Sequence, residues 1–183
     1  LYKDYLEIDA GEFAANTYGP TALTAFLATV YLSYAQNYPD HNQAYYAQRA
    51  ADVLDRIHRK VWDEEMSVYR FAPGDERLML YPNVTTMAAL ARAYQVTGER
   101  RFWERFELTF KGIQALKDDD GDHYHSPYSK ESMGATDDDY TTHSSQNYLM
   151  LALIVAFQVS GEEQYLQEID ILLGFLENRL LIG

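Results

Sequence analysis

Hydrophobic residues along this chain recur with the period of an α-helix in six segments, which alternate between two kinds. Segments of the first kind are rich in Ala, Leu, Thr and Tyr and nearly free of charge, as expected of helices buried on most sides. Segments of the second kind carry apolar residues every three or four positions and charge on the opposite face, as solvent-facing helices do. The first kind covers about 20–37, 82–97 and 142–159. The second kind covers about 41–60, 99–116 and 162–180. The pattern predicts three helical hairpins, at about 18–60, 81–116 and 141–181.

An internal repeat supports this pairing of helices. The run Tyr94–Glu99 closely matches the run Phe157–Glu162, at an offset of 63 residues. Each run contains a glycine, Gly98 or Gly161, where the cap of a helix is expected. The same offset aligns apolar residues on either side of the two runs, so the second and third hairpins are copies of one unit. The first hairpin matches them less closely.

Long links join the hairpins. The link Trp62–Phe71 parallels Lys117–Ser126, because each begins with a carboxylate-rich turn and continues into an extended stretch. Alternating apolar and polar residues in the first link predict a short strand or hairpin arm. We therefore predict an all-α fold over residues 1–183, one domain in which three hairpins form an arc, with short strands in the links. A 63-residue repeat is longer than the roughly 34–47 residues of common helical solenoids, so a closed ring fits better.

The chain resembles about half of an (α/α)6 toroid of the six-hairpin glycosidase-like superfamily, which includes N-acylglucosamine and cellobiose 2-epimerases and unsaturated glucuronyl hydrolases. The link Val61–Tyr69 and the runs Ala88–Phe102 and Ser144–Tyr165 carry the resemblance. It implies a carbohydrate-active protein, a glycoside hydrolase or sugar epimerase, with its pocket at the N-terminal ends of the buried helices. It also implies a fragment of a larger toroid, which self-associates or packs on a second half-toroid. A non-catalytic glycan- or protein-binding hairpin module, or a solenoid scaffold, remains the alternative.

Candidate catalytic residues lie in the longest link. Asp137, Asp138 and Asp139 stand directly before the third buried helix, and His143 falls in the first turn of that helix. A carboxylate and a histidine can move protons on a sugar, and paired carboxylates can hydrolyse a glycosidic bond. A solvated acidic loop that caps the helix explains the same residues and stays open as the alternative.

Candidate substrate-binding residues stand at the starts of the buried helices. Tyr18, Tyr81 and Tyr140 occupy equivalent places in the three hairpins and can form a platform on which a sugar stacks. Asn83 and Gln146 lie in the first turns of the second and third buried helices, and we include them as polar contacts. Tyrosine also packs well at half-buried positions with its hydroxyl in water, so simple packing is the competing interpretation.

Two groups in the same link have the donor atoms that metal ions use. Asp118, Asp120 and Asp122 could hold calcium, but their spacing does not follow the known twelve-residue calcium loop. His123 and His125 would share one side of a strand, yet zinc needs further ligands. We interpret the acidic run as a turn and the histidines as surface residues, so we predict no cofactor and no metal site, with calcium as the alternative.

Composition restricts the function further. The formal net charge of −13 argues against a nucleic-acid partner, because an acidic surface repels phosphates. The absence of cysteine excludes disulfides and thiol catalysis within this chain. The longest apolar run, Tyr148–Phe157, has ten residues, which is too short for a membrane span. The sequence thus indicates a soluble protein, without distinguishing a cytoplasmic from a periplasmic or secreted one.

Overall fold

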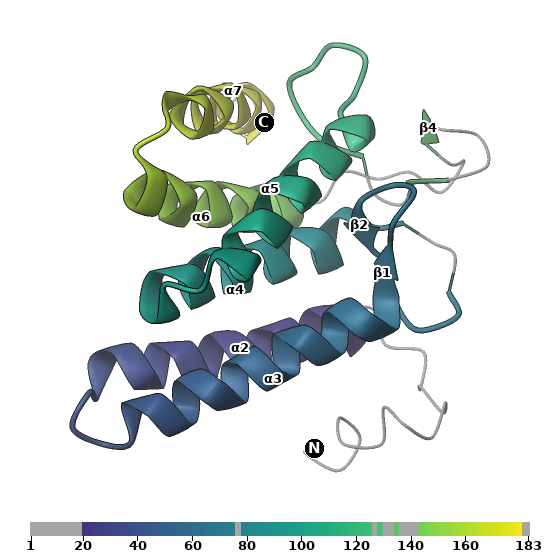
Figure 1. The fold of residues 1–183 in the computed structure, drawn as a ribbon. Helices are drawn as coiled ribbons and strands as arrows, with labels where there is room; N and C mark the ends of the chain where they lie inside the picture. Colours follow the sequence, from purple (N-terminus) through teal and green to yellow (C-terminus); the bar gives the residue numbers. More distant parts are fainter. Residues whose placement is uncertain (1–19, 76–77, 126–127, 130–133, 136–142, 181–183) are drawn as a thin grey trace.

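A computed structural model of the chain describes residues 20–75, 78–125, 128–129, 134–135 and 143–180 (Figure 1). The described residues form three helical hairpins, which confirms the predicted all-α arc. The helices are α2 (Pro20–Asn37), α3 (Gln43–Val61), α4 (Leu80–Thr97), α5 (Arg100–Ile113), α6 (His143–Ser160) and α7 (Glu163–Leu180), with a short 3-10 helix, η2 (Gln114–Leu116). Two antiparallel pairs of two-residue strands lie in the links: β1 (Trp62–Asp63) with β2 (Val68–Tyr69), and β3 (Tyr128–Ser129) with β4 (Gly134–Ala135).

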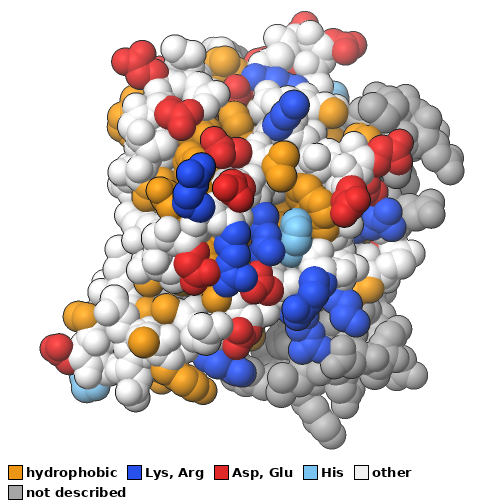
Figure 2. Space-filling model, viewed as in Figure 1, with side chains coloured by type: hydrophobic (Ala, Val, Ile, Leu, Met, Phe, Trp, Pro, Cys, Tyr) orange, Lys and Arg blue, Asp and Glu red, His pale blue; other side chains and the backbone are white. Residues whose placement is uncertain are grey.

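The hairpins build two layers of helices. The helices α2, α4 and α6, which are nearly free of charge, form the inner layer, in which α4 packs between the other two. The amphipathic helices α3, α5 and α7 form the outer layer, whose visible face carries both acidic and basic side chains (Figure 2). The repeat aligns Leu90 with Leu153 in the inner layer, and both are fully buried. It also aligns Phe102 with Tyr165 in the outer layer, and both of these are fully buried as well. None of the described helices is long and apolar enough to span a membrane.

Glycine caps end two inner helices in the same way. Gly98 and Gly161 both adopt a left-handed backbone conformation, with φ of 71° and 72°. The amide of Gly98 donates to the carbonyl of Tyr94, and the amide of Gly161 donates to that of Phe157, each at 2.8 Å. This conformation costs glycine little because it has no Cβ. The sequence match between the two turns is therefore a match of structure.

The two links also begin alike. The amide of Arg70 donates to the carbonyl of Val61 at 2.8 Å, and the amide of His125 donates to that of Leu116 at 2.7 Å. These equivalent contacts align the two links, and the outer helices before them, at an offset of 55 residues. In each link an aspartate then accepts two backbone amides of the acidic turn, as Asp63 does from 65 and 66. The predicted parallel between the links is confirmed.

The two ends of the arc expose apolar side chains. Val30 on α2 is 62% exposed, and on α6 Leu151 is 54% and Ile154 is 41% exposed. Helix α4, which is covered on both sides, has no exposed large apolar side chain among its described residues. On α6, Leu151 and Ile154 lie three residues apart on one face, and neighbouring exposed apolar residues of this kind occur at interaction surfaces.

Candidate functional site

Three aromatic rings meet where the inner helices begin. Phe26 comes from α2, Tyr81 from α4 and Tyr148 from α6, and all three are half-buried. The ring centres of Phe26 and Tyr81 lie 6.3 Å apart, those of Phe26 and Tyr148 5.4 Å, and those of Tyr81 and Tyr148 5.5 Å. These are contact distances for aromatic pairs. We call these residues the inner aromatic cluster; each of the three inner helices contributes one ring to it.

The cluster lies on the side of the inner layer that faces away from the outer helices. On α4, Tyr81, Ala88 and Arg92 fall on one face by the helical period, and all three remain partly exposed. Tyr94 lies on the opposite face, where its ring meets that of Trp103 on α5 at 5.5 Å. The rings of the cluster therefore point to the inner surface of the arc.

Polar groups lie on the same face of the inner layer, Arg92 about three turns after Tyr81 on α4 and two others near Tyr148. Arg92 is the only Asp, Glu, Lys or Arg residue in the three inner helices, and its guanidinium donates to the hydroxyl of Ser33 at 3.3 Å. Ser144 and Asn147 are exposed in the first turns of α6, next in sequence to Tyr148. Apolar rings with a few hydrogen-bonding groups beside them are the usual composition of a site for a small ligand.

Asn83, a predicted substrate contact, has a different position. Its side chain is fully buried. The amide oxygen accepts from the backbone N–H of Tyr69 at 2.6 Å, and the amide nitrogen donates to the carbonyls of Tyr69 at 3.0 Å and Met79 at 2.8 Å. Direct contact with a substrate does not fit this placement. Asn83 instead fixes strand β2 against the start of α4.

Gln146, also a predicted substrate contact, is the counterpart of Asn83 at the 63-residue offset. It is fully buried, and its amide nitrogen donates to the carbonyl of Tyr124 at 2.8 Å. Tyr124 holds the same place in its link that Tyr69 holds in the other. This bond positions the second link as the equivalent bond of Asn83 positions the first, while the buried amide oxygen of Gln146 has no hydrogen-bond partner among the described residues. With the side chain fully buried, direct contact with a substrate does not fit this placement.

Of the other predicted site residues, two lie at least partly within the described residues. Tyr81 joins the inner aromatic cluster. His143 is the first residue of α6, so its backbone stands at an inner helix start as predicted, while its side chain lies outside the described residues. The remaining candidates lie outside the described residues altogether: Tyr18, Asp137, Asp138, Asp139 and Tyr140. Phe26 and Tyr148 were not predicted.

The acidic run in the second link forms a turn. One carboxylate oxygen of Asp118 accepts the amides of Asp120 at 2.9 Å and Gly121 at 3.0 Å. A carboxylate oxygen of Asp122 lies 2.6 Å from Nδ1 of His123. Asp118, Asp122 and His123 each bring one possible ligand atom within 4.8 Å of the others, while Asp120, the central residue of the calcium alternative, is not part of this group. Since hydrogen bonds of the turn account for this arrangement, we assign it no metal ion.

The two histidines of this link pack against aromatic rings. His123 stacks on Phe175 of α7, with ring centres 4.4 Å apart and planes 12° apart. The rings of His123 and His125 lie 5.4 Å apart, edge to face. The contact with Phe175 gives His123 a role in holding the link on α7, so the interpretation as a surface histidine is incomplete for this residue.

Buried tyrosines anchor both links to the outer helices. The hydroxyl of Tyr124 donates to a carboxylate oxygen of Glu168 at 2.7 Å, and burial followed by the Glu168 charge raises the pKa of Tyr124. The hydroxyl oxygen of Tyr69 lies 3.2 Å from Nδ1 of His58. Burial and the positive charge of Arg105 lower the pKa of His58 to about 4, so the imidazole is neutral at neutral pH. These groups stabilise the links and lie in the outer layer, apart from the inner aromatic cluster.

Solved structures share this fold. The cellobiose 2-epimerase of Spirochaeta thermophila superposes on 84% of the chain with a TM-score of 0.72 and 14% sequence identity. The GH76 alpha-mannanase of Bacteroides thetaiotaomicron superposes on 87% with a TM-score of 0.72 and 11% identity. A family 88 glycosyl hydrolase of Bacteroides vulgatus superposes on 94% with a TM-score of 0.66 and 11% identity.

In each case the match covers about half of the other protein: 42%, 44% and 52% of the three chains, respectively. No sequence-defined protein family matches the chain, and no curated protein matches it in sequence. At this level of identity the similarity establishes the fold. The chain has the fold of about half of a six-hairpin (α/α)6 toroid, the fold of epimerases and glycoside hydrolases that act on carbohydrates.

Proposed function

We propose that this chain provides a sugar-binding surface of a carbohydrate-active α/α toroid, and that the inner aromatic cluster is the platform on which the sugar stacks. The observation that carries the proposal is the meeting of Phe26, Tyr81 and Tyr148, one from each inner helix, on the inner surface of the arc. The faces of aromatic rings are suited to the apolar C–H face of a sugar ring, while neighbouring polar groups bind its hydroxyls. Ser144 and Asn147 supply such groups near Tyr148, whereas Arg92 lies about three turns after Tyr81 on α4.

The proposed reaction class is glycoside hydrolysis or sugar epimerisation. The fold is shared with an enzyme named as an epimerase and with enzymes named as glycoside hydrolases. Hydrolysis requires one carboxylic acid to protonate the leaving oxygen and a second carboxylate opposite it, which the run Asp137–Asp139 could supply. Epimerisation next to a carbonyl requires a base that removes and returns a proton on carbon, a role open to His143 at the start of α6. Tyr18 and Tyr140 would extend the platform.

The second candidate function is sugar binding without catalysis. Across the described parts of the chain, the three inner helices carry no carboxylate, so the inner surface presents rings, hydroxyls and one arginine but no acid–base pair. Both functions use the inner aromatic cluster. Turnover of a bound disaccharide, followed by sugar analysis of the products, distinguishes them.

We expect Tyr81→Ala and Tyr148→Ala each to weaken sugar binding about tenfold, which corresponds to about 1.4 kcal/mol. Each substitution removes one of the three aromatic rings on which the sugar is proposed to stack. Isothermal titration calorimetry with cellobiose and with a mannan oligosaccharide measures the effect. Tyr45→Ala is the matched control, because Tyr45 is 59% exposed on outer helix α3. Unchanged affinity in both cluster variants, with native circular dichroism, would contradict the proposal.

The apolar flanks of the arc suggest how the site is completed. We propose that α2 and α6 pack on a second half-toroid or on a second copy of this chain. The chain alone is then expected to have a solution mass above 21.1 kDa by sedimentation equilibrium, because it would pair through Leu151 and Ile154. Leu151→Lys is expected to restore the monomer mass, whereas Leu108→Lys, at an exposed site on outer helix α5, is not. A monomer at every concentration would argue against pairing of two copies.

A further inference from the structure

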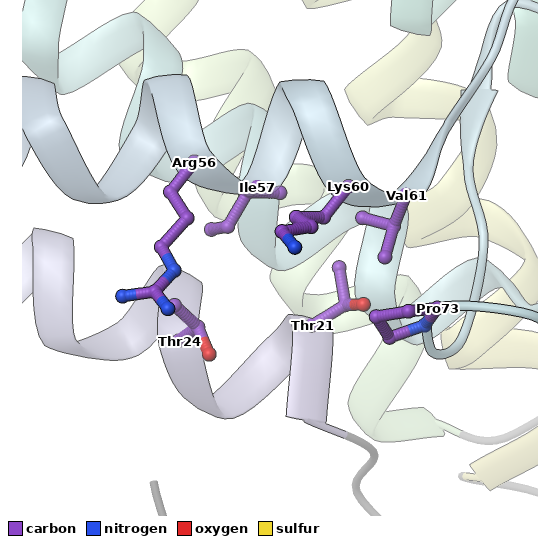
Figure 3. Close-up of a pocket in the computed structure, with 7 residues that line it drawn as sticks. All are labelled: Thr21, Thr24, Arg56, Ile57, Lys60, Val61 and Pro73. Carbon is purple, nitrogen blue, oxygen red and sulfur yellow. The ribbon is translucent and has the colours of Figure 1, made fainter. Parts of the chain in front are cut away.

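A basic pocket lies at the open end of the first hairpin, where α2 begins and α3 ends (Figure 3). It is small and partly open to solvent, and Ile57, Val61 and Pro73 give it an apolar lining between the two basic side chains that border it. Arg56 and Lys60 extend into it from α3 toward Thr24 and Thr21 of α2, with Ile57 at its back. Arg59, next in sequence, is exposed and adds a third positive charge to this end of α3.

The equivalent place in the second hairpin is covered by the link that precedes that hairpin. There the backbone carbonyls of Met66 and Ser67 press against Gly112 near the end of α5. In the third hairpin the preceding link again covers this place, where His123 stacks on Phe175 of α7. Gly112 and Phe175 are counterparts at the 63-residue offset. In the second and third hairpins, the link that precedes each hairpin therefore packs on its outer helix.

Ile57 is the counterpart of Gly112 in the first hairpin. The link-closing hydrogen bonds from Arg70 to Val61 and from His125 to Leu116 align α3 with α5 at an offset of 55 residues, which brings 57 onto 112. The basic pocket is thus the place where the segment preceding α2 should bind. That segment is residues 1–19, which continue directly into Pro20 and the pocket residue Thr21.

Charge supports the same occupant. Residues 1–19 contain four acidic side chains and a single lysine. The acidic residues are Asp4, Glu7, Asp9 and Glu12. Both described links also carry an acidic turn where they cover a hairpin end. We propose that the acidic segment 1–19 docks at the pocket bordered by Arg56 and Lys60, in the place that the two links occupy on the other hairpins.

Zero-length carbodiimide cross-linking of the full chain tests this proposal, since it joins only amines and carboxylates in direct contact. We expect an intrachain cross-link between Lys60 and Glu7, Asp9 or Glu12, identified by mass spectrometry. Lys111, near the end of α5 and exposed, is the control that should not join this segment. Mixing ¹⁵N-labelled and unlabelled protein separates contacts within one chain from contacts between two.

A charge exchange gives the second arm of the test. The double substitution Glu7→Lys/Glu12→Lys is expected to reduce the segment's cross-links to Lys60 at least about threefold, because it reverses two of the four acidic charges. In the charge-swapped protein, which combines Lys60→Glu with Glu7→Lys and Glu12→Lys, a new cross-link between residue 60 and the segment should appear. Cross-links only between chains would assign the pocket to a second copy. Their absence, with Lys60 freely acetylated, would assign it to solvent or a small anion; either result would overturn the proposal.

Discussion

Gly112→Ala is expected to lower the free energy of unfolding by about 3 kcal/mol, the upper end of the usual cost of overpacking. A Cβ at this position would collide with the carbonyl oxygen of Ser67 and lie 2.6 Å from that of Met66. Both obstacles are backbone atoms of the turn between β1 and β2, so no side chain can move aside. The link or helix α5 must shift. Chemical denaturation measures the loss, and the midpoint of thermal unfolding should fall by roughly 6–12 °C for a chain of this size.

Gly174→Ala is the matched control for this substitution. Gly174 lies within outer helix α7, one residue from the counterpart of Gly112, and an added Cβ there meets nothing within 4 Å. Because alanine favours the helix over glycine, this variant is expected to be more stable by about 0.5–1 kcal/mol. Equal effects of the two substitutions would mean that the first link does not lie against α5.

Asn83→Ala is expected to lower the free energy of unfolding by about 3 kcal/mol. The substitution removes three hydrogen bonds and leaves the buried N–H and carbonyl of Tyr69 without their amide partner. The start of α4 and strand β2 would separate or take in water. Equilibrium denaturation measures the loss, and hydrogen exchange at the Tyr69 amide should accelerate in the variant, since that N–H loses its acceptor.

Asn37→Ala controls for the loss of an asparagine that bonds to its own helix. The amide of Asn37 donates to the carbonyl of Ser33 at 2.8 Å, the same one-turn contact that Asn83 makes with Met79, but on the surface. For Asn37→Ala, a change in the free energy of unfolding of no more than about 0.5 kcal/mol is expected. A similarly small loss for Asn83→Ala would show that the amide does not hold the link.

Most of the helical architecture could be predicted from the sequence because it depends on local patterns. Helical periodicity, absence of charge and glycine caps are all visible along the chain, and the 63-residue repeat groups them into hairpins. The observed helix bounds differ from the predicted ones by three residues at most, at the end of α5, where the chain continues as the 3-10 helix η2.

The candidate site was harder to predict, for a physical reason. An inner helix is apolar all round, so its sequence does not mark which side faces the arc's inner surface. Phe26 and Tyr148 therefore resembled ordinary core residues, and Arg92 was the one available signal for that face of α4. Polar residues at a helix start suggest a pocket, so the sequence alone predicts that Asn83 and Gln146 contact a substrate. Only the packed links show that both amides are covered by backbone.

The central claim is that sugar binds on the inner surface of the arc, and NMR of the protein with ¹³C-labelled aromatic residues tests it most directly. Titration with cellobiose and with a mannan oligosaccharide should shift the ring signals of Phe26, Tyr81 and Tyr148 together, with one saturation curve. The signals of Tyr34 and Tyr45, which are exposed elsewhere, should stay in place. Saturable shifts confined to Tyr34 or Tyr45, or no shift of the three cluster rings with either sugar, would contradict the account.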